Sequence, residues 1–251
     1  MNYIEEHLIK KILNTTVDHM PFDHVFIENI FPDDFYEKLV KNLPNLSEYT
    51  AIKDTGTVGQ NYSSERYIIN FEQNTKFENI SFTNLYNKLI SVLTSKKLFD
   101  TVSSHFIKSI KKRVENFSEK EKEKFGLSNF KFDLRAALVK DLTKYSLGAH
   151  TDSISKYITF LFYLPKDNSI QNIGTSLFKP KKERENYNFH SNHYTDEETK
   201  KIFDEVKMCP FKQNSVLIFP RHPMSFHGVN KVNINKKERD LLLLNYYFKK
   251  I

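Results

Sequence analysis

Apolar side chains recur at helical spacing through the first half of the chain. Residues 3–13 place their apolar side chains on one helical face, which predicts an amphipathic helix. The alternation of side chains over His24–Ile27 predicts a short strand. A second helix is expected to begin after Pro32, with two carboxylates in its first turn, and to end before Pro44. Helical periodicity returns from Phe77 to Lys124.

Short apolar runs separated by turn residues replace the helical pattern after Gly126. They are rich in β-branched and aromatic residues, and they predict five strands, over Phe132–Val139, Tyr157–Leu164, Thr175–Phe178, Ser215–Phe219 and Leu241–Phe248. We expect one domain over residues 1–251. Residues 1–126 would form a helical support with an N-terminal strand, and residues 127–251 a mainly β core, a barrel or jelly roll buttressed by those helices.

Two polar stretches interrupt this pattern. Residues 51–64 are rich in turn formers and predict a surface loop. Residues 179–203 lie between predicted core strands and have few apolar anchors. We expect this second stretch to be an insertion that acts as a lid over a binding site.

The chain has one cysteine among its 251 residues. Cys209 alone excludes a disulfide within the chain, a thiolate zinc site and an iron–sulfur cluster built from this chain. It is expected to be a small packing residue. Any metal must therefore be held by histidine and carboxylate side chains.

Net charge and hydropathy indicate whether the protein binds nucleic acid or a membrane. The net charge is +7, but the basic clusters at residues 111–124 and 179–184 are interleaved with glutamate, which indicates a solvated lysine-rich surface and no nucleic-acid partner. No apolar run approaches the roughly 20 residues that cross a bilayer, and the N-terminus has no basic-then-apolar leader. We expect no membrane partner and a cytoplasmic location, and no oligomeric state is predicted.

The strongest chemical signal is His150-Thr151-Asp152. In extended backbone, residues i and i+2 point to one side, so an imidazole and a carboxylate would face one point. Downstream, His227 follows a buried strand and Arg239 opens a very apolar one. Two histidines and one carboxylate are the facial triad of non-haem Fe(II), and arginine suits an acid that chelates the metal with its other end.

With these residues in view, the chain resembles the Fe(II)/2-oxoglutarate-dependent dioxygenase superfamily, in its prolyl-4-hydroxylase-like branch. The resemblance is carried by His150 and Asp152, by His227 in SFHGV and by Arg239 in RDLLLLNYYF. HTDSISKYITFLFYLP, GTSLFKP and VKMCPFKQNSVLIFP resemble the family's core strands in order, and PFDHVFIENIFPDDFYEKLVKNLP resembles its lead-in. The resemblance to the superfamily covers most of residues 20–250.

The resemblance implies a double-stranded β-helix, or jelly roll, and a set of site residues. His150, Asp152 and His227 would be the iron ligands, and Arg239 would pair with the C5 carboxylate of 2-oxoglutarate. Tyr163 matches a position that hydrogen-bonds the same carboxylate. Thr159, on the same face of that strand, is a fainter cofactor-binding match.

The implied cofactors are Fe(II) and 2-oxoglutarate as co-substrate, with O2 as oxidant and ascorbate as an optional reductant. The implied reaction is hydroxylation of an unactivated C–H bond in a small molecule or a peptidyl side chain such as prolyl, with release of succinate and CO2. Because related halogenases carry a small residue in place of the carboxylate, Asp152 favours hydroxylation.

Each site residue also has a plainer interpretation. His150 and Asp152 could form a polar turn, His227 could be a core histidine, and Arg239 could be a strand-end residue paired with Asp240. Their joint occurrence, in order and on suitable strands, favours the iron site.

Several neighbouring residues carry weaker signals. Lys156 is interpreted as an exposed lysine at a strand edge. The family's upstream tyrosine would stand nearer Lys140 or Asp141, which leaves Tyr145 as a possible pocket residue. Three other histidines carry weaker signals: His190 and His193 are interpreted as surface or lid residues, and His222 as an edge of the pocket.

Two other functions stay open at this point. One is a non-catalytic jelly-roll binding module, against which the retention of all three ligands and Arg239 argues. The other is an AlkB-like nucleic-acid demethylase, suggested by the positive charge. That class has an extra arginine-rich motif after the distal histidine, whereas Arg239 stands alone in residues 236–240.

Overall fold

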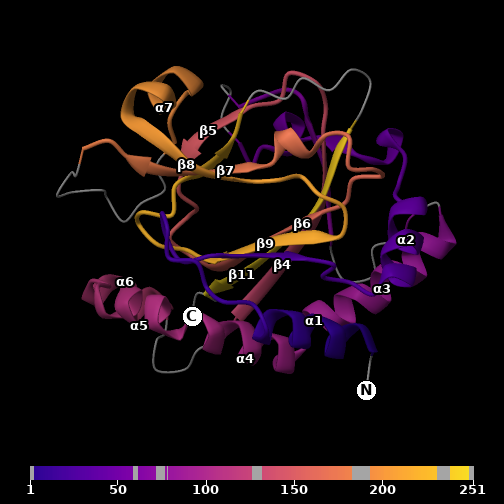
Figure 1. The fold of residues 1–251 in the computed structure, drawn as a ribbon, viewed down its shortest axis with the longest axis horizontal. Helices are drawn as coiled ribbons and strands as arrows, with labels where there is room; N and C mark the ends of the chain where they lie inside the picture. The colour runs from indigo at the N-terminus through magenta and orange to yellow at the C-terminus, as the bar shows by residue number, and fades with distance from the viewer. Residues whose placement is uncertain are drawn as a thin grey trace.

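Two antiparallel sheets form the centre of the molecule, and helices cover the outer face of the larger one (Figure 1). The computed structural model describes residues 3–58, 62–71, 77, 79–125, 132–182, 193–230 and 238–248. The seven-stranded sheet has the order β1-β9-β6-β11-β4-β3-β2, and the four-stranded sheet has the order β5-β10-β7-β8. Two facing antiparallel sheets with these crossovers are the jelly-roll arrangement expected from the sequence.

The larger sheet joins strands from both halves of the chain. Its members are β1 (Val25–Glu28), β2 (Thr50–Ala51), β3 (Arg66–Asn70), β4 (Phe132–Asp141), β6 (Lys156–Tyr163), β9 (Ser215–Pro220) and β11 (Arg239–Phe248). The smaller sheet consists of β5 (Leu147–His150), β7 (Thr175–Pro180), β8 (Phe203–Cys209) and β10 (His227–Val229). The N-terminal strands occupy both edges of the larger sheet.

The helices before residue 126 follow the predicted periodicity, whereas the last helix lies in the stretch predicted as a polar insertion. In chain order the helices are α1 (Tyr3–Leu13), α2 (Asp33–Lys41), α3 (Ile80–Leu93), α4 (Lys96–His105), α5 (Ile107–Glu115), α6 (Glu119–Phe125) and α7 (Asp196–Ile202), with short 3-10 turns at Leu46–Glu48, Ile52–Thr55 and Gln171–Ile173. Helices α1, α3 and α4 lie beneath the larger sheet, whereas α7 packs against β5 and β8 on the other side (Figure 1). In the parts of the chain that the structure describes, no helix is long and apolar enough to cross a bilayer.

Strand alternation divides the apolar residues into two cores. Phe160 and Phe162 of β6, like Leu242 of β11, face the helices. Tyr163 and Leu241 face the space between the two sheets and belong to a second core. Side chains on this second face are those that can line a site between the sheets.

The same alternation separates the first two residues of β11. Arg239 lies between the sheets, whereas Asp240 lies on the helix-covered face and accepts a hydrogen bond from Lys140 Nζ at 2.6 Å. The interpretation of Arg239 as a partner of Asp240 is therefore wrong, because adjacent residues in a strand point to opposite faces.

The predicted elements are confirmed with some additions. All five predicted strands are present, and the helix over 3–13 has the predicted bounds. The sequence pattern missed β3, β8 and the short strands β2, β5 and β10. In the predicted surface loop at 51–64, residues 52–55 form a 3-10 turn, and residues 59–61 lie outside the described part of the chain. In the predicted insertion at 179–203, the described residues include the last two residues of β7 and the whole of α7. Residues 183–192 lie outside the described part of the chain.

Candidate metal site and anion site

His150, Asp152 and His227 converge at one end of the smaller sheet. His150 ends β5 and His227 begins β10, and the two residues are cross-strand partners. Asp152 follows His150 by two residues. One ligand atom from each side chain lies within 4.8 Å of the others, and all three residues are buried. The structure thus brings together the three residues that the sequence predicts as metal ligands.

Backbone carbonyls fix the orientation of both imidazoles. His150 Nδ1 lies 3.0 Å from the Gly148 carbonyl oxygen, and His227 Nδ1 lies 3.0 Å from that of Ser225. A carbonyl oxygen only accepts, so each Nδ1 carries the proton and donates, which leaves a lone pair on Nε2. Burial lowers the pKa of both histidines, which keeps the imidazoles neutral as a metal ligand must be.

Two neighbouring side chains hold the Asp152 carboxylate. Lys156 Nζ donates to Oδ1 at 2.6 Å, and Thr159 Oγ1 donates to Oδ2 at 2.7 Å. Although burial opposes ionisation, the Lys156 ammonium holds the pKa of Asp152 well below its usual range. Asp152 is therefore a carboxylate, and its oxygens keep further lone pairs for a metal.

These contacts bear on the sequence-based interpretations of Lys156 and Thr159. The interpretation of Lys156 as an exposed strand-edge residue is wrong, because its side chain is 18% exposed and ion-paired to Asp152. The predicted contact of Thr159 with a cofactor stays a prediction. Its observed partner is a candidate metal ligand, which gives it an orienting role.

The donor set suits a divalent transition metal with open coordination positions. Two neutral imidazoles and one carboxylate on one side of an ion match the facial triad of non-haem Fe(II), which leaves positions for other ligands. Structural zinc sites, by contrast, are closed by four protein ligands. The three residues fit an iron that binds a second molecule.

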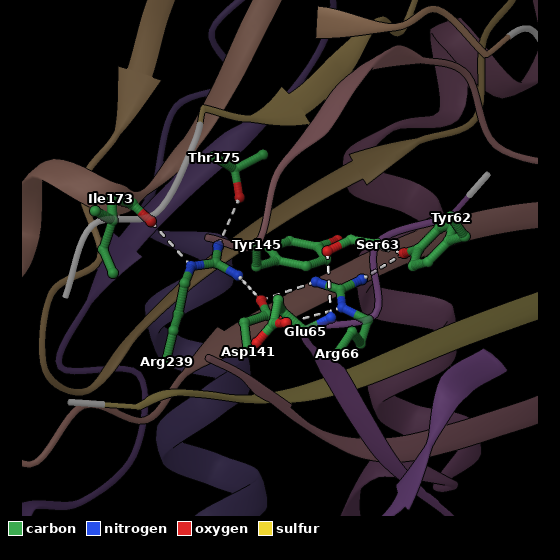
Figure 2. A network of polar contacts seen from close by, with 9 residues as sticks. All are labelled: Tyr62, Ser63, Glu65, Arg66, Asp141, Tyr145, Ile173, Thr175 and Arg239. Carbon is green, nitrogen blue, oxygen red and sulfur yellow. Dashed lines mark hydrogen bonds and ion pairs between the residues drawn. The ribbon is translucent and has the colours of Figure 1, made fainter. Parts of the chain in front are cut away.

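Arg239 lies deeper between the sheets and is 1% exposed. Its Nε donates to the Ile173 carbonyl oxygen at 2.9 Å, Nη1 to Asp141 Oδ2 at 2.7 Å, and Nη2 to Thr175 Oγ1 at 3.5 Å (Figure 2). The same Thr175 hydroxyl accepts from the Tyr163 hydroxyl at 2.6 Å. Arg239 and Tyr163, both predicted to contact one carboxylate, thus meet at Thr175.

Sequence reasoning missed Arg66 and gave Asp141 no role. Arg66 Nε donates to Asp141 Oδ1 at 2.6 Å, and Nη2 donates to Oδ2 at 2.9 Å (Figure 2). Although burial disfavours its charge, Asp141 raises the pKa of Arg66 well above the usual value. Tyr145 is fully buried beside this pair, and the Arg66 guanidinium lies 4.2 Å from the centre of its ring.

The other histidines occupy different positions. The exposed His193 stacks on His150, with ring centres 5.2 Å apart, so it covers one side of the metal site in agreement with its interpretation as a surface or lid residue. His190 lies outside the described residues. His222 borders a pocket of about 470 Å³ together with Phe22, Pro220 and Met224. Cys209 is fully buried in the core between the sheets, which confirms its packing role.

Buried histidines predict acid sensitivity of the metal-free protein. Burial lowers the pKa of His24, and it lowers that of His222 to about 4. Below about pH 6.5 the unfolded chain binds more protons at these sites than the folded chain does. The free energy of unfolding should therefore fall from pH 7 to pH 5, by up to about 1.4 kcal/mol per pH unit for each such imidazole.

Denaturant unfolding at several pH values measures this dependence. His222→Gln should reduce the slope by up to one proton. An unaltered slope in the His222 variant would contradict the assignment of a neutral, partly buried imidazole at this position.

Comparisons with known proteins identify the fold. No family model matches the chain, and no curated protein sequence matches it. Among solved structures, a Trichoplax adhaerens prolyl hydroxylase, in complex with a hypoxia inducible factor oxygen degradation domain peptide fragment, has a TM-score of 0.51 and 12% identity over 98% of this chain and 90% of that chain. A Pseudomonas putida prolyl-4-hydroxylase has a TM-score of 0.49 and 9% identity, over 98% of this chain and 99% of its own. HygX from Streptomyces hygroscopicus, with nickel, 2-oxoglutarate and hygromycin B bound, has a TM-score of 0.49 and 11% identity, over 94% of this chain and 84% of that chain. The likeness to the Trichoplax enzyme confirms the resemblance at the level of the fold: the chain has a jelly-roll fold similar to that of this prolyl hydroxylase.

Proposed function

We propose that this protein is an Fe(II)- and 2-oxoglutarate-dependent oxygenase that hydroxylates an unactivated C–H bond and releases succinate and CO2. The observation that carries the proposal is the buried set of two neutral imidazoles and one carboxylate, with ligand atoms within 4.8 Å of one another. It lies at the edge of a jelly roll whose interior holds a buried arginine. A binding module would have no need of such a donor set.

Each residue has a role in the proposed reaction. His150, Asp152 and His227 would hold the iron, which when bound supplies the chelation of a 2-oxo acid and the activation of O2. Arg239 would bind the distal carboxylate of 2-oxoglutarate, with Tyr163 beside it. Lys156 and Thr159 keep the Asp152 carboxylate ionised and oriented.

The spacing of the two sites along the strands agrees with these roles. Thr159, which contacts Asp152, and Tyr163, beside Arg239, are four residues apart on β6, or roughly 13 Å at about 3.3 Å per residue. Thr175 is two residues from Leu177, the cross-strand partner of His227. These separations suit a short dicarboxylic acid and the side chains that hold its two ends.

Asp152 also supports hydroxylation over halogenation, since the carboxylate occupies the place that a halide would need. The substrate class that we propose is a small molecule or a peptidyl side chain such as prolyl, with no nucleic acid. A cytoplasmic location, a single domain over the whole chain and ascorbate as an optional reductant belong to the same proposal.

Anaerobic addition of Fe(II) and 2-oxoglutarate tests the proposal. The purified protein should develop the metal-to-ligand charge-transfer absorbance of a chelated 2-oxo acid, and Arg239→Ala should weaken it. Arg135→Ala is the matched control, because Arg135 is an exposed arginine of the same sheet. In air, succinate release should rise when a screened peptide or metabolite is the substrate. Absence of the band in folded protein would overturn the proposal.

A further inference from the structure

A buried carboxylate lies between two guanidinium groups in the space between the sheets (Figure 2). Asp141 ends β4, Arg66 begins β3 and Arg239 begins β11, and Asp141 is the cross-strand partner of both arginines. Asp141 is fully buried, and the two arginines are at most 8% exposed. Three charged side chains at adjacent strand ends thus form one cluster.

The two arginines contact Asp141 in different ways. Arg66 binds both carboxylate oxygens, with Nε on Oδ1 at 2.6 Å and Nη2 on Oδ2 at 2.9 Å. Arg239 reaches only Oδ2, through Nη1 at 2.7 Å. Arg66 is itself held, since Nη1 donates to the Tyr62 hydroxyl at 3.1 Å and the guanidinium lies over the Tyr145 ring. Arg66 therefore fixes the position of the Asp141 carboxylate, and Asp141 in turn fixes the orientation of the Arg239 guanidinium along one edge.

Arg239 keeps donors for a further acceptor. Its contacts with Ile173, Asp141 and Thr175 engage three of its five N–H groups, counting acceptors among the described residues only. If Asp141 were free to turn, it could bind Arg239 with both oxygens, as carboxylates do with arginine. The grip of Arg66 on both oxygens opposes that arrangement.

The charges of the cluster do not cancel. Two arginines and one carboxylate give a formal charge of +1, counted over these three residues. Of the groups that face them, Tyr145 and Tyr163 are neutral near pH 7, because burial raises the pKa of each. A buried excess charge is unfavourable unless an opposite charge pairs with it. One carboxylate would make the cluster neutral.

We propose that Arg66 and Asp141 are positioning residues for Arg239: Asp141, held by Arg66, orients the guanidinium and leaves the cluster short of one negative charge, which the distal carboxylate of the co-substrate supplies. This inference deepens the proposed function and rests on it for the identity of the co-substrate. It assigns co-substrate affinity to two residues on strands β3 and β4 that do not contact the metal ligands.

The test changes the net charge of the cluster by mutation and measures the binding of 2-oxoglutarate. Arg66→Met leaves a neutral Asp141–Arg239 pair and frees Asp141 to bind Arg239 with both oxygens. The Kd of 2-oxoglutarate, from anaerobic titration of the Fe(II) protein, should rise about 10- to 100-fold. The KM for 2-oxoglutarate should rise with it, while kcat changes little. Arg135→Met, on the exposed side of β4, should change neither.

A double variant separates this role from a merely structural one. Arg66→Met with Asp141→Asn removes one positive and one negative charge, which restores the formal charge of +1 and releases Arg239. The Kd of 2-oxoglutarate should return to within about threefold of wild type. If the double variant binds 2-oxoglutarate no better than Arg66→Met, or if Arg66→Met binds normally, the inference is overturned.

A metal-free measurement distinguishes this inference from the proposed function. Calorimetric titration of glutarate, a dicarboxylate that cannot chelate as a 2-oxo acid, reports the anion site alone. Binding to wild type that weakens in Arg66→Met and recovers in the double variant supports the cluster even if the Fe(II) protein shows no 2-oxoglutarate band. A wild-type protein that binds neither 2-oxoglutarate nor glutarate overturns both.

Discussion

Asp152→Ala is expected to abolish the charge-transfer absorbance of the Fe(II) and 2-oxoglutarate complex and to weaken Fe(II) binding by more than about 100-fold. The variant removes the one carboxylate of the triad. It also leaves the Lys156 ammonium, now 2.6 Å from Asp152 Oδ1, without that partner beside two neutral imidazoles. A divalent cation would then meet a positive charge where it now meets a negative one.

Two further variants make this result specific. Asp152→Asn keeps the shape of the side chain: its amide oxygen can accept from Lys156, and its NH2 group can donate to the Thr159 hydroxyl, so it should fold as the wild type does and lose Fe(II) affinity mainly through charge. Asp204→Ala, at an exposed position of β8, should bind Fe(II) normally. Retention of the full absorbance by folded Asp152→Ala would show that the triad is not the metal site.

Asp141→Ala is expected to cause the largest loss of stability, about 3–5 kcal/mol in the free energy of unfolding. It leaves two buried guanidinium groups side by side with no carboxylate between them. Repulsion between the arginines adds to the cost of their burial. For a chain of this length the melting temperature should fall by roughly 10 °C.

The matched control lies on the same strand. Asp133→Ala removes a carboxylate whose side chain is 51% exposed and which pairs with Arg135 at 3.5 Å. Exposed ion pairs contribute little, so its free energy of unfolding should stay within about 1 kcal/mol of wild type. Thermal and denaturant unfolding of both variants measure the difference, and equal losses would contradict the burial argument.

The candidate metal site could be predicted because its signals are local. His150 and Asp152 are two residues apart, and strand alternation alone places them on one side. His227 follows a buried strand in the expected order. The apolar periodicities of β6, β9 and β11 likewise predict their own strands, so a barrel or jelly roll could be predicted from the pattern of the chain, and the jelly roll itself only from the resemblance.

The second set of contacts could not be predicted, because its partners are far apart in sequence. Arg66 and Asp141 are separated by 75 residues, and Asp141 and Arg239 by 98. Arg66 opens a five-residue strand after a turn-rich stretch, where an arginine ordinarily lies in solvent. The prediction for Lys156 is wrong for a related reason: its ammonium turns back to a residue in the preceding loop, and the sequence shows only its place at a strand end.

The opening residues of β11 also determine how that strand aligns with β4. Arg239 stands opposite Asp141 on one face, and Asp240 stands opposite Lys140 on the other. A slip of one residue would place Asp240 against Asp141 in one direction and Arg239 against Lys140 in the other, so either shift opposes like charges. The all-leucine run that follows could slide without such a penalty. The charges of the proposed anion site therefore also fix the register of the central strand pair.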